Sequence, residues 1–301
     1  MKRVFLFVIT NIAVIAMLTL VTNLILSLFG TSVEAVFGQR YSHLLVMSIV
    51  YGFGGSLISL LLSKPMAKMS TKAKTIDGSE GDAERWLVAT VEDLARRAGL
   101  KTPEVAIYPG EPNAFATGAF RNSALVAVST GILGSMSRDE LKAVLGHEMS
   151  HVANGDMVTM CLCQGVLNAF VILFSRILAS VIEGAVSGDR RNRRSSGGIL
   201  YWVVVHVLQI ALGVLASLIT CAYSRRREYA ADAGSARLLG SPSPMIAALR
   251  RLGGIEAGAL PDSLKAFGVA SAKKTSLFAT HPAIEARVEA LQNLPPDFMN
   301  L

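Results

Sequence analysis

Charged residues are scarce in this chain of 301 residues: Asp, Glu, Lys and Arg make up only 17% of it. A soluble globular domain carries about 25%. The shortfall lies in four long runs that lack these residues altogether, at 4–29, 41–63, 157–175 and 195–224. Each run is long enough to cross a bilayer, which takes roughly 20 apolar residues. The scarcity of charge therefore indicates an integral membrane protein with four apolar helices rather than a soluble protein.

Cysteine is also rare, and one common nucleotide motif is missing. Cys161, Cys163 and Cys221 all lie in the apolar runs, and their spacing matches neither a disulfide framework nor a zinc ribbon. We expect them to be small packing residues. The chain has no G-x-x-x-x-G-K-[ST] loop, and without that loop a P-loop nucleotide site is excluded.

The first apolar run follows Lys2 and Arg3, as the core of a signal peptide would. Such a core has about 7–15 residues, and this run is nearly twice as long, so we interpret it as a retained transmembrane helix. Basic residues beside apolar spans favour the cytoplasm. After the second run they are Lys64, Lys68, Lys72 and Lys74. Both flanks of the first hairpin, and the polar stretch 64–156, are therefore expected in the cytoplasm.

The net charge of +7 does not require a nucleic-acid partner. Most of the basic residues flank apolar runs, where membrane topology explains them. We expect a lipid bilayer as a partner, and neither nucleic acid nor nucleotide.

The polar segments show the pattern of a small α+β domain. Residues 64–81 are rich in Lys, Thr, Ser and Gly and are expected to form a linker. Apolar residues then recur at helical spacing over 84–98. Short strands are expected at 104–108 and 123–129. Further helices are expected at 224–252 and 281–293.

A helix that opens on the capping box Ser137–Glu140 leads into His147-Glu148-Met149-Ser150-His151, an H-E-x-x-H pattern. Positions four apart lie on one face of a helix. His147 and His151 can therefore bind one Zn²⁺, while Glu148 faces the water that the metal would carry.

Such a site needs a third protein ligand and one open position. A metzincin would have Gly at 154 and His at 157, but these residues are Asn154 and Met157. The remaining downstream candidates are Asp156, Glu183, His206, Glu228, Asp232 and His281. Glu228 and Asp232 are favoured because they lie four apart on a predicted helix. One can bind the metal while the other accepts the N–H of a ligand histidine.

Four separated elements, taken in order, resemble the HtpX family of bacterial heat-shock membrane metalloproteases, relatives of the CAAX prenyl proteases. They are Asn113–Gly118 (N-A-F-A-T-G), His147–His151, Glu228–Asp232, and His281-Pro282 followed by Arg287. The resemblance covers essentially the whole chain. It implies that His147, His151 and Glu228 bind one zinc ion per subunit, that Glu148 is the catalytic base, and that Asp232 supports a ligand histidine.

His281 and Arg287 have two interpretations each. The resemblance favours a catalytic role for His281, as the donor that stabilises the oxyanion. The alternative is that His281 only precedes a helix whose first residue is Pro282. Arg287 either orients His281 or pairs with Glu285 or Glu289.

Asn113 is expected to hydrogen-bond the substrate backbone, with an ordinary loop asparagine as the alternative. The strand at 123–129 is expected to offer an edge with which an extended peptide can pair.

The resemblance implies a mainly α integral membrane protein with four apolar helices and a cytoplasmic α+β gluzincin-type metalloprotease domain that contains a small β-sheet. Four segments are expected: a transmembrane hairpin (1–63), the first catalytic segment (64–156), a second apolar hairpin (157–223) and the second catalytic segment (224–301). Arginines at 190–194 would lie outside if the second hairpin crosses, against the positive-inside tendency. The second hairpin therefore either crosses the bilayer or packs on the catalytic domain.

The implied function is a multi-pass zinc endopeptidase of the bacterial inner membrane. It would cleave misfolded or damaged membrane proteins on the cytoplasmic side as part of stress quality control. The alternatives are a narrower processing peptidase of the CAAX prenyl protease type, and a non-enzymatic membrane scaffold with a relict motif.

Overall fold

The computed structural model describes residues 20, 23–24, 26–27, 32, 40–186, 197–254 and 277–298. Within them, three helices are long and apolar enough to cross a membrane: α3 (Arg40–Thr71), α7 (Asp156–Val186) and α8 (Gly197–Leu239). Three of the four expected apolar helices are thus confirmed. Most of the first expected helix, at 4–29, and the arginines at 190–194 lie outside the described residues.

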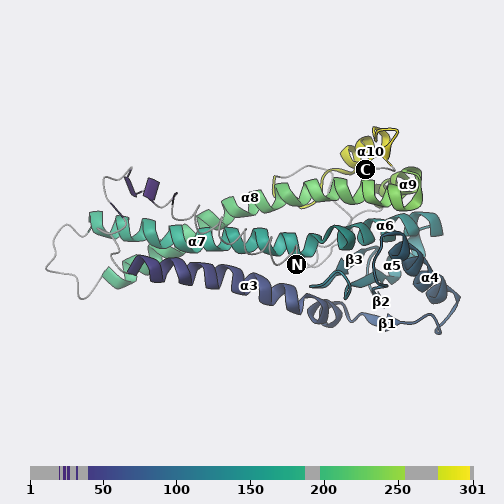
Figure 1. Ribbon diagram of the computed structural model, residues 1–301, viewed down its shortest axis with the longest axis horizontal. Helices are drawn as coiled ribbons and strands as arrows, with labels where there is room; N and C mark the ends of the chain where they lie inside the picture. Colours follow the sequence, from purple (N-terminus) through teal and green to yellow (C-terminus); the bar gives the residue numbers. More distant parts are fainter. Residues whose placement is uncertain are drawn as a thin grey trace. The chain divides into compact units, whose positions relative to one another are not determined.

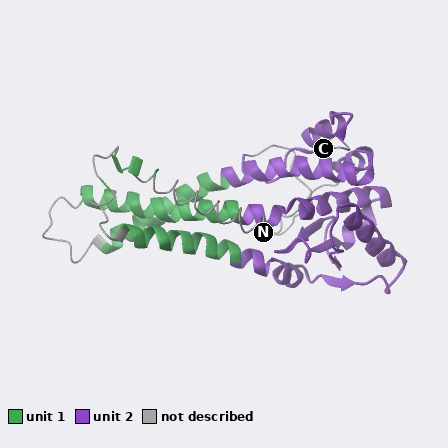
Figure 2. Ribbon diagram, in the orientation of Figure 1, with its two compact units in different colours: residues 1–57, 162–217 green, residues 58–161, 218–301 purple. Residues whose placement is uncertain are grey.

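The chain divides into two compact units (Figure 2). Unit 1 contains residues 1–57 and 162–217, and unit 2 contains residues 58–161 and 218–301. The helices α3, α7 and α8 each contribute residues to both units. The division into four segments that the sequence suggests stays a prediction.

In unit 1, small residues bring α3 and α7 close together. A Cβ atom on Gly52 would come within 2.5 Å of the backbone nitrogen of Ala169, and one on Gly165 within 2.6 Å of the Phe53 ring. Close approach at small residues is how helices associate in a bilayer. Larger side chains, including Tyr41, Phe53, Leu173, Phe174 and Ile177, surround these contacts.

Unit 2 is built on a four-stranded mixed sheet (Figure 1). Its strands are β1 (Lys74–Ile76), β2 (Glu104–Tyr108), β3 (Ala114–Thr117) and β4 (Leu125–Ser129), in the order β1-β2-β4-β3. β2 and β4 are parallel, and the other two pairs are antiparallel. The prediction of an open edge on the strand at 123–129 is wrong, because β4 is paired on both sides. The edge strand beside it is β3.

The expected linker at 64–81 is also mostly regular structure. α3 continues past Pro65 to Thr71, and β1 follows at Lys74. Lys64 and Lys68 lie 2.7 and 2.5 Å from the carboxylate of Glu104. These contacts attach the end of α3 to β2, which explains why a Lys-rich segment continues the helix.

Five shorter helices also belong to unit 2: α4 (Asp82–Arg97), α5 (Thr130–Ser135), α6 (Arg138–Asn154), α9 (Ser243–Gly254) and α10 (Ile284–Gln292). The capping box of α6 is confirmed, since the Ser137 side chain accepts from the Glu140 backbone and the Glu140 side chain accepts from the Ser137 backbone. The predicted helix at 224–252 is interrupted, because Gly240 adopts a left-handed φ of 78° after Leu239. The helix predicted at 281–293 begins three residues later than expected.

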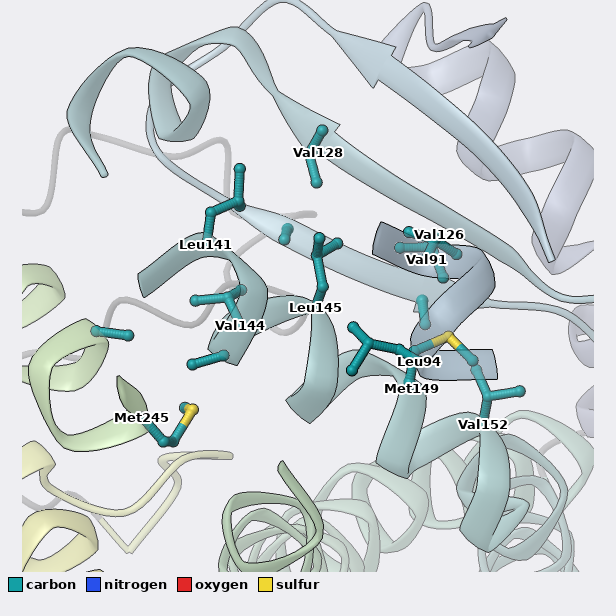
Figure 3. Packing of buried hydrophobic residues seen from close by; sticks show 14 of the residues in the cluster. Val91, Leu94, Val126, Val128, Leu141, Val144, Leu145, Met149, Val152 and Met245 are labelled. Atoms are coloured by element: carbon teal, nitrogen blue, oxygen red, sulfur yellow. The ribbon is translucent and has the colours of Figure 1, made fainter. Parts of the chain in front are cut away.

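The core of unit 2 surrounds α6, the helix that carries the H-E-x-x-H motif (Figure 3). Leu141, Val144, Leu145, Met149 and Val152 of α6 are all buried. They pack against β4, α4 and α9 through a set of side chains that includes Val126, Val128, Val91, Leu94 and Met245. Because buried side chains enclose α6, its backbone has little freedom, and the motif is presented on a fixed support.

Candidate metal centre

Three buried side chains from two helices converge at the motif. The Nε2 atoms of His147 and His151 on α6 lie 3.1 Å apart. Glu228 on α8 places Oε2 at 3.4 Å from Nε2 of His147 and Oε1 at 3.4 Å from Nε2 of His151. One ligand atom from each residue lies within 4.8 Å of the other two. The structure thus brings together the three residues that the resemblance implies as ligands.

The chemistry of this group fits a divalent metal ion. The Nδ1 atom of His147 faces Asp232 at 2.9 Å, and that of His151 faces Asp156 at 2.5 Å. With Nδ1 engaged by a carboxylate, each histidine can present a bare Nε2 to the centre. Oε2 of Glu228 is buried and has no hydrogen-bond partner. Two imidazole nitrogens and a carboxylate oxygen suit Zn²⁺ and related cations.

The buried carboxylates around His147 and His151 shift the pKa values of both histidines. Burial alone would lower the pKa of His151, but the carboxylates of Asp156 and Glu228 raise it to about 10. His147 behaves in the same way: burial opposes charge, while Asp232 and Glu228 raise its pKa above the ordinary value. The raised pKa values of both histidines show that the buried acids favour positive charge at this centre, and a bound cation would supply such charge.

Glu148 lies beside this group and contacts the sheet. Its Oε2 accepts a hydrogen bond from the backbone N–H of Ala116 on β3 at 2.8 Å. Burial raises the pKa of the Glu148 carboxyl, although the neighbouring histidines act in the opposite direction. The residue expected to act as base therefore lies between the three converging side chains and the edge strand.

The geometry of β3 explains that contact. The N–H of Ser129 donates to the carbonyl of Asn113 across the strand pair. Hydrogen-bonded and non-hydrogen-bonded pairs alternate along antiparallel strands. Ala114 and Ala116 therefore direct their backbone groups away from β4, and the N–H of Ala116 meets Glu148 on that side.

Arg287 on α10 is fully buried and forms a bidentate contact with Asp232. Its Nε and Nη2 atoms donate to the two carboxylate oxygens at 2.7 and 2.6 Å. Its Nη1 atom lies 3.7 Å from Oε2 of Glu228. Of the two interpretations of Arg287, pairing with Glu285 or Glu289 is wrong, because its carboxylate partners come from α8. Bidentate contacts of this kind fix both partners in the plane of the guanidinium.

His281 reaches the same group from the segment before α10. Its Nδ1 atom lies 2.8 Å from Oε2 of Glu228, but the angles are not those of a hydrogen bond, and both ring nitrogens of His281 lack a hydrogen-bond partner. The N-cap of α10 is Ala283, so Pro282 does not occupy the first helical position. His281 is therefore placed beside the candidate ligands, with Nδ1 close to Glu228 and Nε2 without a hydrogen-bond partner.

Asn113 is buried next to the edge strand. Its backbone N–H donates to the Ser129 hydroxyl at 2.9 Å, and its Oδ1 atom is buried without a hydrogen-bond partner. It precedes β3, the strand that contacts Glu148 through Ala116. The structure thus places Asn113 three residues from the contact with the base.

The other sequence candidates for a third ligand lie elsewhere or act differently. Among the described residues, His147, His151 and Glu228 form the one group of three or more potential ligands close enough together to share a metal ion. Glu183 and His206 belong to unit 1, and His206 bonds the Trp202 carbonyl of its own helix. Asp156 contacts Nδ1 of His151, on the opposite side of the ring from the Nε2 that faces His147 and Glu228.

An H-E-x-x-H helix whose third candidate ligand is a glutamate from a later helix defines a gluzincin-type metallopeptidase. The chain belongs to peptidase family M48, whose model matches residues 82–294. It is therefore a membrane-bound metalloprotease that uses a metal cofactor and acts on polypeptides. The HtpX-family resemblance drawn from the sequence is confirmed.

The relatives support this assignment along the full length of the chain. A protein named "Protease HtpX homolog" from Janthinobacterium sp. (strain Marseille) is 55% identical over 98% of this chain and 100% of its own length. One of the same name from Bordetella pertussis is 52% identical over 97% of this chain and 99% of its own. The crystal structure of S. mikatae Ste24p shares the fold, with a TM-score of 0.57 at 19% identity. That match covers 85% of this chain and 60% of Ste24p.

Proposed function

We propose that this protein is a zinc endopeptidase of the bacterial inner membrane that cleaves misfolded or damaged membrane proteins at the cytoplasmic face. One observation carries the catalytic part: His147, His151 and Glu228 converge while Glu148 stands beside them on the side of the edge strand. The single zinc ion per subunit would be held by these three residues.

The residues divide the chemistry between them. Zinc held by this group supplies a Lewis acid that polarises the scissile carbonyl and makes water more acidic. Glu148 takes a proton from the attacking water and passes it to the leaving nitrogen. Burial raises the pKa of its carboxyl, which makes it a better proton acceptor. His281, whose Nε2 has no hydrogen-bond partner while Nδ1 lies close to Glu228, donates to the developing oxyanion.

The substrate is proposed to bind as an extended strand along β3. The N–H and carbonyl of Ala114 and the carbonyl of Ala116 face away from β4, while the Ala116 N–H is bound to Glu148. Main-chain pairing through the groups other than that N–H would hold a peptide with little dependence on its sequence. This suits an enzyme that acts on damaged proteins of many sequences. Asn113, buried at the start of the strand, would bind the peptide backbone with its free Oδ1 or its amide group.

The membrane location follows from distances along the chain. His151 lies five residues before the start of α7, and Glu228 five residues after the apolar run of α8 ends at Tyr223. Such short connections span at most about 18 Å when extended, so the site lies near the bilayer. The basic residues that follow the second apolar run support a cytoplasmic position for the site. In this proposal residues 1–63 and 157–223 are membrane segments, and 64–156 and 224–301 form the catalytic domain.

The substrate class can be tested with purified protein in lipid nanodiscs. We expect a destabilised membrane protein in the same disc to be cleaved in its cytoplasmic loops, faster than a soluble unfolded chain supplied at equal concentration. Glu228→Ala should abolish both reactions and lower zinc content, whereas Glu92→Gln, at an exposed position on α4, should change neither. Preferential cleavage of a prenylated peptide would instead favour the narrow processing peptidase.

A further inference from the structure

Each histidine of the metal centre contacts a buried aspartate through Nδ1, the ring nitrogen that faces away from the other ligands. For His147 this partner is Asp232, the residue expected to support one of the two histidines. For His151 it is Asp156, whose Oδ2 lies 2.5 Å from Nδ1. Both aspartates are buried, so neither contact is a loose surface pair.

Each aspartate is in turn approached by an arginine. Arg287 binds Asp232 with two short contacts, and Arg227 on α8 places Nη1 at 3.5 Å from Oδ2 of Asp156. Arg227 directly precedes Glu228. The centre therefore contains two Asp–Arg pairs, one behind each histidine.

The contact between Asp156 and His151 depends on a turn and not on helical spacing. Five residues along a continuous helix would place the two side chains about 140° apart around the axis. Here α6 ends at Asn154, and Gly155 adopts a left-handed φ of 72° before α7 begins at Asp156. The change of direction at Gly155 returns Asp156 to the ring of His151. Glycine suits this position because other residues rarely adopt a positive φ.

A simpler role for Asp156 is that of an acid in the first turn of a helix, where it interacts favourably with the helix dipole. That role needs only an exposed carboxylate. Asp139 illustrates it, since it is an exposed acid in the first turn of α6. Asp156 is buried, engaged with His151 and faced by Arg227, which the dipole alone does not explain.

We propose that Asp156 is the positioning residue of His151 and that Arg227 holds its carboxylate in place. Asp156 fixes the ring orientation and the tautomer in which Nε2 is free to bind the metal. This role rests on the proposed function, because it assumes that His151 is a metal ligand. Since Asp156 is also the first residue of α7, the orientation of a metal ligand is tied to the start of a helix long enough to span a membrane.

The test is the zinc affinity of the full-length protein in detergent, measured by competition with a chromogenic chelator. All variants are made in a Glu148→Gln background, so that self-cleavage does not alter the sample. Asp156→Asn is expected to weaken zinc binding by about 10–100-fold, as loss of a partner behind a metal-bound histidine does. Asp232→Asn should show a loss of similar size, and Asp139→Asn should leave the affinity unchanged.

Gly155→Ala gives an independent check if Asp156→Asn is poorly folded. It keeps every side chain of the site, and its added Cβ meets open space, but the left-handed backbone is strained. We expect weaker zinc binding in the same direction. If Asp156→Asn and Gly155→Ala both bind zinc as tightly as Asp139→Asn does, Asp156 does not position His151. If the Glu148→Gln parent itself binds no zinc, the proposed function fails as well.

Discussion

Removing Arg287 should destabilise the metal-free protein strongly. The side chain is fully buried, and Arg287→Met would remove the guanidinium that binds both oxygens of Asp232, leaving His147 as its remaining partner. Breaking a buried pair by removing one partner costs about 3–5 kcal/mol. For a domain of roughly 150–250 residues, each kcal/mol lowers Tm by about 2–4 °C. We therefore expect Tm to fall by roughly 6–20 °C.

A double variant separates this effect from simple loss of packing. Replacing both members of a buried pair by apolar residues is often close to neutral, so Arg287→Met with Asp232→Leu should recover most of the lost Tm while losing zinc affinity. Arg250→Met, at an exposed position on α9, controls for loss of a positive charge. The assay is thermal unfolding of the metal-free, detergent-purified protein. A Tm for Arg287→Met equal to that of Arg250→Met, or a double variant less stable than Arg287→Met, would refute the reasoning.

Four further predictions concern the base, the pH dependence of stability and the membrane topology. Ala116→Pro removes the N–H that donates a hydrogen bond to Glu148. It should reduce proteolysis sharply while the zinc content stays at the level of the parent. Undiminished cleavage would mean that β3 does not support the base. In the metal-free protein, the raised pKa of His151, about 10, contributes stability that is complete below its unfolded value of about 6.5. Unfolding free energy should therefore fall as pH rises from the unfolded to the folded value, and a flat profile would contradict the buried histidine–carboxylate pair. Lys72→Cys should resist an impermeant thiol reagent applied to intact cells, and labelling from outside would reverse the proposed topology. Labelling of Ser196→Cys from outside would show that the second apolar hairpin crosses the bilayer, and protection would show that it does not.

The parts of the site that could be predicted from sequence depend on short-range periodicity. The i, i+4 spacing of His147 and His151 and the capping box at Ser137 specify a helix and its face without knowledge of the rest of the fold. Glu228 and Asp232 share a face for the same reason. The choice of Glu228 as a ligand then needed the family resemblance, because the spacing alone does not say which acid faces the centre.

The remaining features depend on contacts between distant parts of the chain. Arg287 meets Asp232 across a sequence separation of 55 residues, and nearby acids offered a more obvious pairing. Asp156 contacts His151 only because Gly155 redirects the backbone. β3 has only four residues, two of them alanines, so its strand pattern is weak, and only pairing with β4 identifies it as the edge.

The most direct test of the central claim is to measure zinc content and proteolysis together in Glu148→Gln. Glu148 lies outside the group of three converging side chains, so the purified variant should bind zinc as the wild type does. It should also fail to cleave an unfolded substrate protein that the wild type digests. Retained cleavage in this variant, or loss of its zinc, would contradict the assignment of Glu148 as the base beside a metal held by His147, His151 and Glu228.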